Sequence, residues 1–198
     1  PISSLMGWVN FLEDGEKPRQ EIAKSMNEDI ARLNEISERF SKIGSNPQLK
    51  EIKLDIILSE LTSYLQQRLP KRSKIKLSFT SHTSSTLFGD KVLLTWAFEN
   101  IIRNAIDAIE AGNGSVEVVL SHIEGTIQID IIDSGKGIDR KHWKNIFKPG
   151  FSTKNRGWGL GLSLTYRIIT EIHTGSIVVA NSKLGKTVIR VKFNLHNP

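Results

Sequence analysis

Two asparagines and an aspartate recur at one-turn spacing between residues 90 and 110. On a helix, Asn100, Asn104 and Asp107 stand at i, i+4 and i+7 and therefore share one face. Asparagine is a mediocre helix former, so a plain exposed face would more usually carry lysine and glutamate. Two amide carbonyls one turn apart suit a Mg²⁺ ion that phosphates and water also hold. Taken alone, an ordinary exposed face remains the simpler interpretation. The apolar residues of the opposite face are Leu94, Phe98, Ile101, Ile102, Ala105 and Ile109.

A second group of polar and flexible residues lies at the end of the alternating stretch 126–133 and just after it. Asp133 lies at the mouth of this predicted strand, where its carboxylate can accept a hydrogen bond from the exocyclic amine of a base. Gly135 and Gly137 permit positive φ and leave room for a flat base. This turn is therefore a candidate base-binding site.

Three further glycines, Gly157, Gly159 and Gly161, come just before an apolar helical run over 162–172. Such a segment offers backbone N–H groups and a helix N-terminus to phosphates. Each glycine motif alone could be a structural turn. Together with the asparagine stripe, the motifs supply a base site, a metal site and a phosphate site, which indicates a nucleotide.

The elements that must position these residues form an α+β pattern. Residues 54–68 have helical spacing, and a long helix is expected over 90–110. Strands and helices do not alternate as βαβ units, which predicts a two-layer α/β sandwich over 48–198. The expected strands are 75–80, 115–122, 126–133, 176–182 and 187–195.

The first 44 residues predict a helical hairpin. A short amphipathic run over 2–12 precedes a heptad-like seam over 17–43, in which only Asp29 places a charge at an apolar position. A lone hairpin cannot bury this seam, so we expect a second copy to complete a four-helix bundle. Packing of the hairpin on the following domain is the alternative. Glycine and proline between residues 43 and 47 mark the boundary.

Composition excludes several classes of protein. The 198 residues carry a net charge of +6 and no cysteine, which excludes disulfides and thiolate metal sites. No stretch is long and apolar enough for a bilayer span, and no secretion signal is evident, so these residues are expected to be cytoplasmic and without direct membrane contact, while membrane anchoring of a longer parent protein is left open. Basic residues are not interleaved with aromatics, so nucleic-acid binding has no support.

Residues 50–198 resemble the ATP-binding domain of sensor histidine kinases, within the wider group that includes gyrase, Hsp90 and MutL. The resemblance implies the Bergerat ATP-binding fold, with ATP and Mg²⁺ bound. It depends on four motifs in the family's order, namely an N box at 100–105, a G1 box at 133–137, an F box at 146–151 and a G2 box at 157–162.

The resemblance also implies a role for each matching residue. Asn104 is the principal Mg²⁺ ligand, Asn100 a second polar contact to the metal or phosphates, and Asp133 the residue that recognises adenine. A lid over 151–156 would bring Lys154 or Arg156 to phosphate, although a loop lysine is usually only solvated. The other implied nucleotide contacts are Asp107, Gly135, Gly137, Ile138, Phe147, Thr153, Gly157, Trp158, Gly159, Leu160, Gly161 and Leu162.

In this family the dimerisation hairpin carries the phosphate-accepting histidine, and a receiver domain of a response regulator takes the phosphate onto an aspartate. Residues 1–5 resemble the tail of the family's H box, so we expect the acceptor upstream of residue 1. None of the five histidines has that context. His173 instead looks like the end of a helix, where a cation is favourable.

The residue at position 100 distinguishes phosphoryl transfer from ATP hydrolysis. The gyrase and MutL relatives carry a water-activating glutamate four residues before the metal asparagine, whereas this chain has Asn100, which cannot accept a proton from water. Glu99 is rotated about 100° away on the helix. The alternatives to a histidine kinase are an ATPase, or a module that binds ATP and dimerises without transferring phosphate.

Overall fold

The computed structural model describes residues 2–14, 18–27, 29–30, 47–70, 72–110, 112–152 and 159–194. The chain divides into two compact units, Pro1–Pro47 and Gln48–Pro198, and each is described by itself. Among the described residues no helix is both long enough and apolar enough to cross a membrane.

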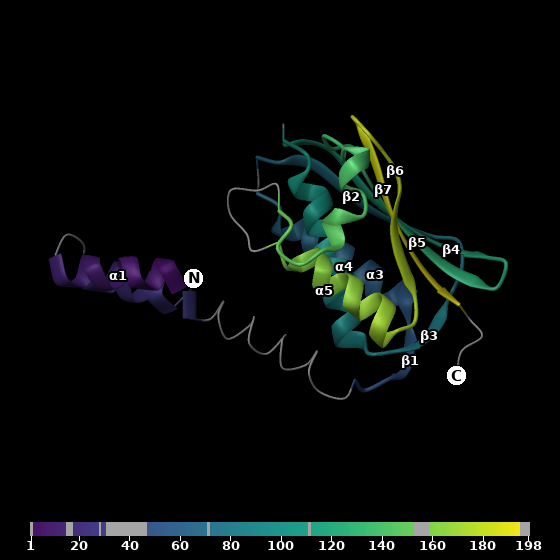
Figure 1. Ribbon diagram of the computed structural model, residues 1–198, viewed down its shortest axis with the longest axis horizontal. Coiled ribbons are helices and arrows are strands. Elements are labelled where there is room, and N and C mark those ends of the chain that lie inside the picture. The colour runs from purple at the N-terminus through teal and green to yellow at the C-terminus, as the bar shows by residue number, and fades with distance from the viewer. Residues whose placement is uncertain are drawn as a thin grey trace. The chain divides into compact units, whose positions relative to one another are not determined.

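The first unit contains two helical segments that pack side by side (Figure 1). Helix α1, Ile2–Asp14, is followed by helical residues 19–27 and 29–30. Ile22 is completely buried, and the Trp8 indole Nε1–H donates to Asp29 Oδ2 at 3.2 Å. The one charge on the predicted apolar seam therefore has a hydrogen-bond partner across the hairpin. The remainder of that seam, residues 31–43, lies outside the described residues.

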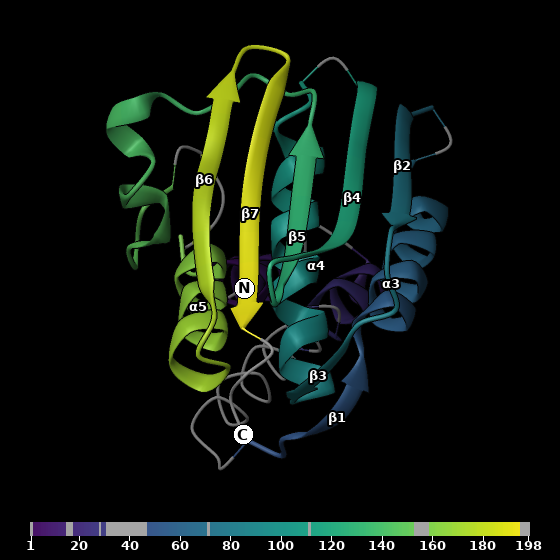
Figure 2. The ribbon, with the colours of Figure 1, turned by 90° about the vertical axis from the view of Figure 1, so that its right-hand side faces the viewer.

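The second unit is a five-stranded sheet with three helices on one face, which confirms the predicted two-layer α/β sandwich (Figures 1 and 2). The strand order is β2-β4-β5-β7-β6, in which only the β2–β4 pair is parallel. The strands are β2 Lys74–Ser81, β4 Asn113–Ile123, β5 Thr126–Asp133, β6 Ser176–Lys183 and β7 Lys186–Asn194, and the helices are α3 Leu54–Arg68, α4 Lys91–Asp107 and α5 Gly161–Arg167.

Helix α4 is fixed against the sheet by its apolar face. Leu94 and Phe98 are completely buried, and each such side chain contributes roughly 1.5–3 kcal/mol when removed from water. Asp90 caps the helix, because its Oδ1 accepts from the backbone N–H groups of Val92 and Leu93. The helix ends at Asp107, earlier than the predicted residue 110, in a tight final turn.

Two features of the unit were not predicted. Strand β1, Lys50–Lys53, pairs with β3, Thr86–Gly89, as a separate two-stranded sheet. Each strand has four residues, too few for a clear alternation. The expected helix over 162–172 is divided, because α5 continues as the π-helical turn η3, Ile168–Ile172.

His173 ends η3, but the predicted cation at this helix end is wrong. Its ring is buried, Nε2 accepts from the Asp90 backbone N–H at 2.9 Å, and Nδ1 lies 2.8 Å from the Ile168 carbonyl. A ring that accepts at Nε2 must carry its proton at Nδ1, which donates to Ile168. Burial lowers the pKa of His173, against smaller opposing effects of the Ile168 hydrogen bond and the Asp90 charge. The residue is therefore a neutral connector between the start of α4 and the end of η3.

Replacing His173 by glutamine should remove one component of acid destabilisation. Since the folded-state pKa lies below the unfolded value, the contribution of neutral His173 is complete above about pH 6.5 and declines as the pH falls below it. Urea unfolding at pH 5, 6 and 7 should show the wild type losing up to about 1.4 kcal/mol per pH unit more than His173→Gln. Replacement of the exposed His82 by glutamine is the control. Equal pH slopes for wild type and His173→Gln would contradict the assignment.

Candidate functional site

The site centres on a buried carboxylate at the end of β5. Asp133 is 5% exposed, and its Oδ1 accepts from the Gly135 N–H at 2.8 Å in a local turn. Burial raises the pKa of Asp133, and the Gly135 hydrogen bond opposes that rise. Among the described residues Oδ2 has no hydrogen-bond partner, so this oxygen can accept from a ligand N–H group.

The segment that follows, residues 134–138, is termed the glycine loop, and α4 holds one side of it. The Lys136 N–H donates to the Ala108 carbonyl at 3.0 Å, and Lys136 Nζ lies 2.8 Å from Glu110 Oε1. A Cβ on Gly135 would lie 2.7 Å from Ala108. The prediction of a positive φ at Gly135 is wrong, and its missing side chain makes room for Ala108 at the end of α4.

The turn between β6 and β7 holds the other side of the glycine loop. The Gly185 N–H donates to the Gly135 carbonyl at 2.9 Å, and the Ile138 N–H donates to Ser182 Oγ at 2.7 Å. Gly137 does have the predicted positive φ, +84°, but a Cβ there would lie 2.9 Å from the Lys183 backbone. The Ile138 carbonyl accepts from the Trp143 indole at 3.0 Å. The loop is thus anchored on both sides.

Strand register places two hydroxyl groups beside Asp133 that sequence reasoning missed. Thr187 on β7 pairs directly with Asp133 on β5 and is 2% exposed. Ser182 on β6 pairs with Thr187, and their hydroxyl oxygens are 2.9 Å apart. Directly opposed residues share a sheet face, so the three side chains form one row. The predicted hairpin turn over 183–186 fixes the Ser182–Thr187 pairing, whereas no local signal in the sequence specifies the pairing of β7 with β5.

The polar stripe lies on α4 beside the face that buries Leu94, Phe98 and Ile101. Asn100 and Asn104 are half-buried, and Asp107 is exposed. Asn100 Nδ2 is buried and has no hydrogen-bond partner among the described residues. An unpaired buried donor costs about 1–3 kcal/mol, so a ligand oxygen that accepts from it would be stabilising.

The start of α5 approaches this stripe. A Cβ on Gly161 would lie 3.6 Å from Asn100 Oδ1, and no side chain caps the first turn of α5. Before it, Gly159 has φ +64°, and a Cβ there would lie 2.6 Å from the backbone of Gly150 and Phe151. The structure therefore brings Gly161 to the side of Asn100, and Gly159, Leu160 and Leu162 adjoin Gly161 in the chain. Four predicted contacts, Thr153, Lys154, Gly157 and Trp158, lie outside the described residues, as does Arg156.

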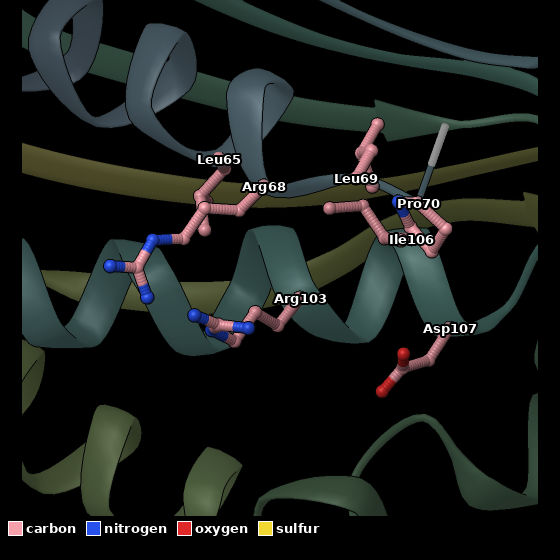
Figure 3. Close-up of a pocket in the computed structure, with 7 residues that line it drawn as sticks. All are labelled: Leu65, Arg68, Leu69, Pro70, Arg103, Ile106 and Asp107. Carbon is pink, nitrogen blue, oxygen red and sulfur yellow. The ribbon is translucent and has the colours of Figure 1, made fainter. Parts of the chain in front are cut away.

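Two further predicted residues have contacts of their own. Phe147, at the end of the 3₁₀ turn η2 (Asn145–Phe147), lies with its ring 6.0 Å from that of Tyr166 on α5. Asp107 borders a groove between α3 and α4, and its carboxylate points away from α3 (Figure 3). Both arginines of this groove are engaged, Arg103 with Glu99 at 2.8 Å and Arg68 above the Tyr64 ring at 4.5 Å. The other lining residues are Leu65, Leu69, Pro70 and Ile106.

The amide oxygens of Asn100 and Asn104 fit a hard cation such as Mg²⁺ only when bound phosphate and water supply its other ligands. The described residues contain no cluster of three or more histidine, aspartate or glutamate side chains able to hold a metal by themselves. Asn104 and Asn100 would supply amide oxygens on one side of α4, and Mg²⁺ prefers to keep water and phosphate oxygens as its other ligands.

Comparison with known proteins identifies a matching family and its relatives. Residues 89–197 match the family described as histidine kinase-, DNA gyrase B-, and HSP90-like ATPase. The sensor histidine kinase ZraS of Escherichia coli is 30% identical over 190 residues, 92% of this chain and 40% of that protein. Sporulation kinase A of Bacillus subtilis is 25% identical over 197 residues, 98% of this chain and 32% of that protein. The chain thus spans well under half the length of these relatives.

Solved structures support the fold. Acinetobacter baumannii histidine kinase AdeS superimposes with a TM-score of 0.79 at 21% identity, covering 100% of this chain and 96% of AdeS. Histidine kinase ThkA in complex with the response regulator protein TrrA gives a TM-score of 0.73 at 20% identity, covering 98% of this chain and 57% of ThkA.

Replacing Gly135 by alanine should destabilise the second unit by about 1–3 kcal/mol, because the new methyl group overlaps Ala108. Gly161→Ala is the matched control, since its methyl group has ordinary contact distance to Asn100 and α5 gains a better helix former. Denaturant unfolding measures both variants. Equal stabilities of Gly135→Ala and the wild type would contradict the close approach of the loop to α4.

Proposed function

The chain belongs to the family of histidine kinase-, DNA gyrase B- and HSP90-like ATPases, with sensor histidine kinases as its relatives, and we propose that it binds ATP with Mg²⁺ and transfers the γ-phosphoryl group to a histidine of the dimerisation hairpin. The observation that carries this proposal is the buried Asp133 carboxylate, whose Oδ2 has no partner among the described residues. An acceptor so placed matches the exocyclic amine of adenine.

The phosphates would lie between α4 and the start of α5. Asn100 Nδ2 is a buried donor without a partner among the described residues, and the backbone at Gly161 lies beside it. Asn104, one turn further on, would contribute its amide oxygen to Mg²⁺, which neutralises charge on the phosphates when it is bound. In the transfer step an imidazole nitrogen forms a bond to the γ-phosphorus, while the bond from that phosphorus to the bridging oxygen breaks and ADP leaves with the electron pair.

The surroundings of position 100 favour transfer over hydrolysis. Hydrolysis needs a base near the γ-phosphate, and Asn100 cannot serve as one. Glu99, the adjacent carboxylate, is bound to Arg103 at 2.8 Å on the α3 side of the helix. An imidazole acceptor is itself a nucleophile, so this chain's residues have only to align and neutralise the reacting groups.

The hairpin offers a surface for a second copy. Met6 is 67% exposed, and Val9, Leu12 and Ile30 are each 43% exposed. Burying these side chains against a second hairpin would complete a four-helix bundle and a homodimer. We expect the acceptor histidine before residue 1, and a response-regulator receiver domain as the next acceptor. The ThkA–TrrA complex supports such a partner, because a kinase of the same fold binds a response regulator.

Replacing Asn104 by alanine should remove the metal ligand from the stripe without disturbing the apolar face of α4. Titration calorimetry should show ATP affinity in Mg²⁺ falling about tenfold or more, a loss of roughly 1.4 kcal/mol or more. Affinity in EDTA should change little. Asn10→Ala, on the exposed surface of α1, is the control. Unchanged Mg²⁺-dependent affinity would exclude Asn104 as a ligand.

Transfer itself is tested with γ-³²P-labelled ATP and a version of the protein that extends upstream through the acceptor histidine. The expected product is an acid-labile, alkali-stable phosphoprotein that loses its label to a receiver domain. ATP binding without a phosphoprotein would favour the nucleotide-binding scaffold. Release of free phosphate without a phosphoprotein would favour an ATPase.

A further inference from the structure

The turn between β6 and β7 determines the shape of the glycine loop. Its backbone contacts the loop at two glycines, through the 2.9 Å bond from the Gly185 N–H to the Gly135 carbonyl and through the close approach of Lys183 to Gly137. These backbone contacts persist whatever side chains the turn carries. Next to this turn, on β6, Ser182 Oγ accepts from the Ile138 N–H at 2.7 Å, so a side chain also holds the loop.

Ser182 also connects the loop to the strand beside the buried carboxylate. Its Oγ lies 2.9 Å from Thr187 Oγ1, and Thr187 is the direct partner of Asp133 in the β5–β7 pairing. Since Ser182 Oγ accepts from Ile138, its own proton is available for Thr187. One half-buried hydroxyl thus joins the far end of the glycine loop to the row of side chains that contains Asp133.

We propose that Ser182 is a positioning residue for base recognition: through Ile138 and Thr187 it fixes the glycine loop in the geometry that presents Asp133 Oδ2 to adenine. The inference rests on the proposed function, because it assigns Asp133 to the base. The Asp133 carboxylate is oriented by the Gly135 N–H, and Gly135 lies in the loop whose end Ser182 holds. Ser182 acts through the loop and not on the phosphates, which would lie at Asn100 and Gly161.

The test measures nucleotide affinity for Ser182→Ala in the full 198-residue chain. Loss of the hydroxyl leaves the Ile138 N–H unpaired, so the dissociation constants for MgATP and MgADP should rise by the same factor, about tenfold. The affinity for MgGTP, which lacks the exocyclic amine at that position, should change little, so the preference for ATP over GTP narrows. Ser182→Thr, which keeps the oxygen, should restore the preference. Ser176→Ala, at an exposed position of the same strand, is the control.

Several outcomes would overturn the proposal. A lower melting temperature with an unchanged ATP-to-GTP ratio would make Ser182 merely structural. A greater loss for ATP than for ADP would place its effect at the γ-phosphate. If Ser182→Ala does not fold, Ser182→Cys replaces it, since sulfur is a weaker acceptor of similar size; an undiminished ATP preference in that variant would equally refute the positioning role.

Failure of the proposed function would give a different pattern of nucleotide affinities. In that case the wild type itself would show no preference for ATP over GTP, and Asp133→Asn would bind both nucleotides as the wild type does. If the wild type prefers ATP and Asp133→Asn loses that preference while Ser182→Ala retains it, only the role of Ser182 is refuted.

Discussion

A carboxylate withdrawn from water at the end of β5 is the constraint on which the second unit depends. Desolvation disfavours the charge of Asp133, so the charge must be compensated by hydrogen bonds. One oxygen receives such a bond from the Gly135 N–H, which requires the chain to turn sharply at that point. The turn is held by α4 on one side and by the β6–β7 turn on the other, and both contacts require glycine because the backbones approach too closely for a Cβ.

Helix α4 packs on the sheet with one face and carries the asparagines of the candidate site on another. The buried face, with Leu94 and Phe98 completely inaccessible, fixes the rotation of the helix against the sheet. That rotation in turn places Asn100 beside the start of α5 and leaves Glu99 with Arg103. A change in the apolar pattern would therefore alter the site without replacing any of its polar residues.

Much of this arrangement could be predicted from local patterns. Apolar periodicity predicted α4 and the five main strands, and the one-turn spacing of the asparagines predicted that they share one side of the helix. The partners of Asp133 could not be predicted, because the row of Ser182, Thr187 and Asp133 exists only through strand register. His173 was misjudged for a similar reason: its helix-end position favours a cation, but burial and the Asp90 N–H require a neutral ring.

The Asp90–His173 hydrogen bond also connects two helices that border the candidate site. It joins Asp90, which caps α4, to His173, which follows η3. Further along the same two helices, the Thr165 hydroxyl donates to the Ala97 carbonyl at 3.5 Å. A hydrogen bond far from Asn100 thereby helps to set the spacing between α4 and α5 where Asn100 approaches Gly161.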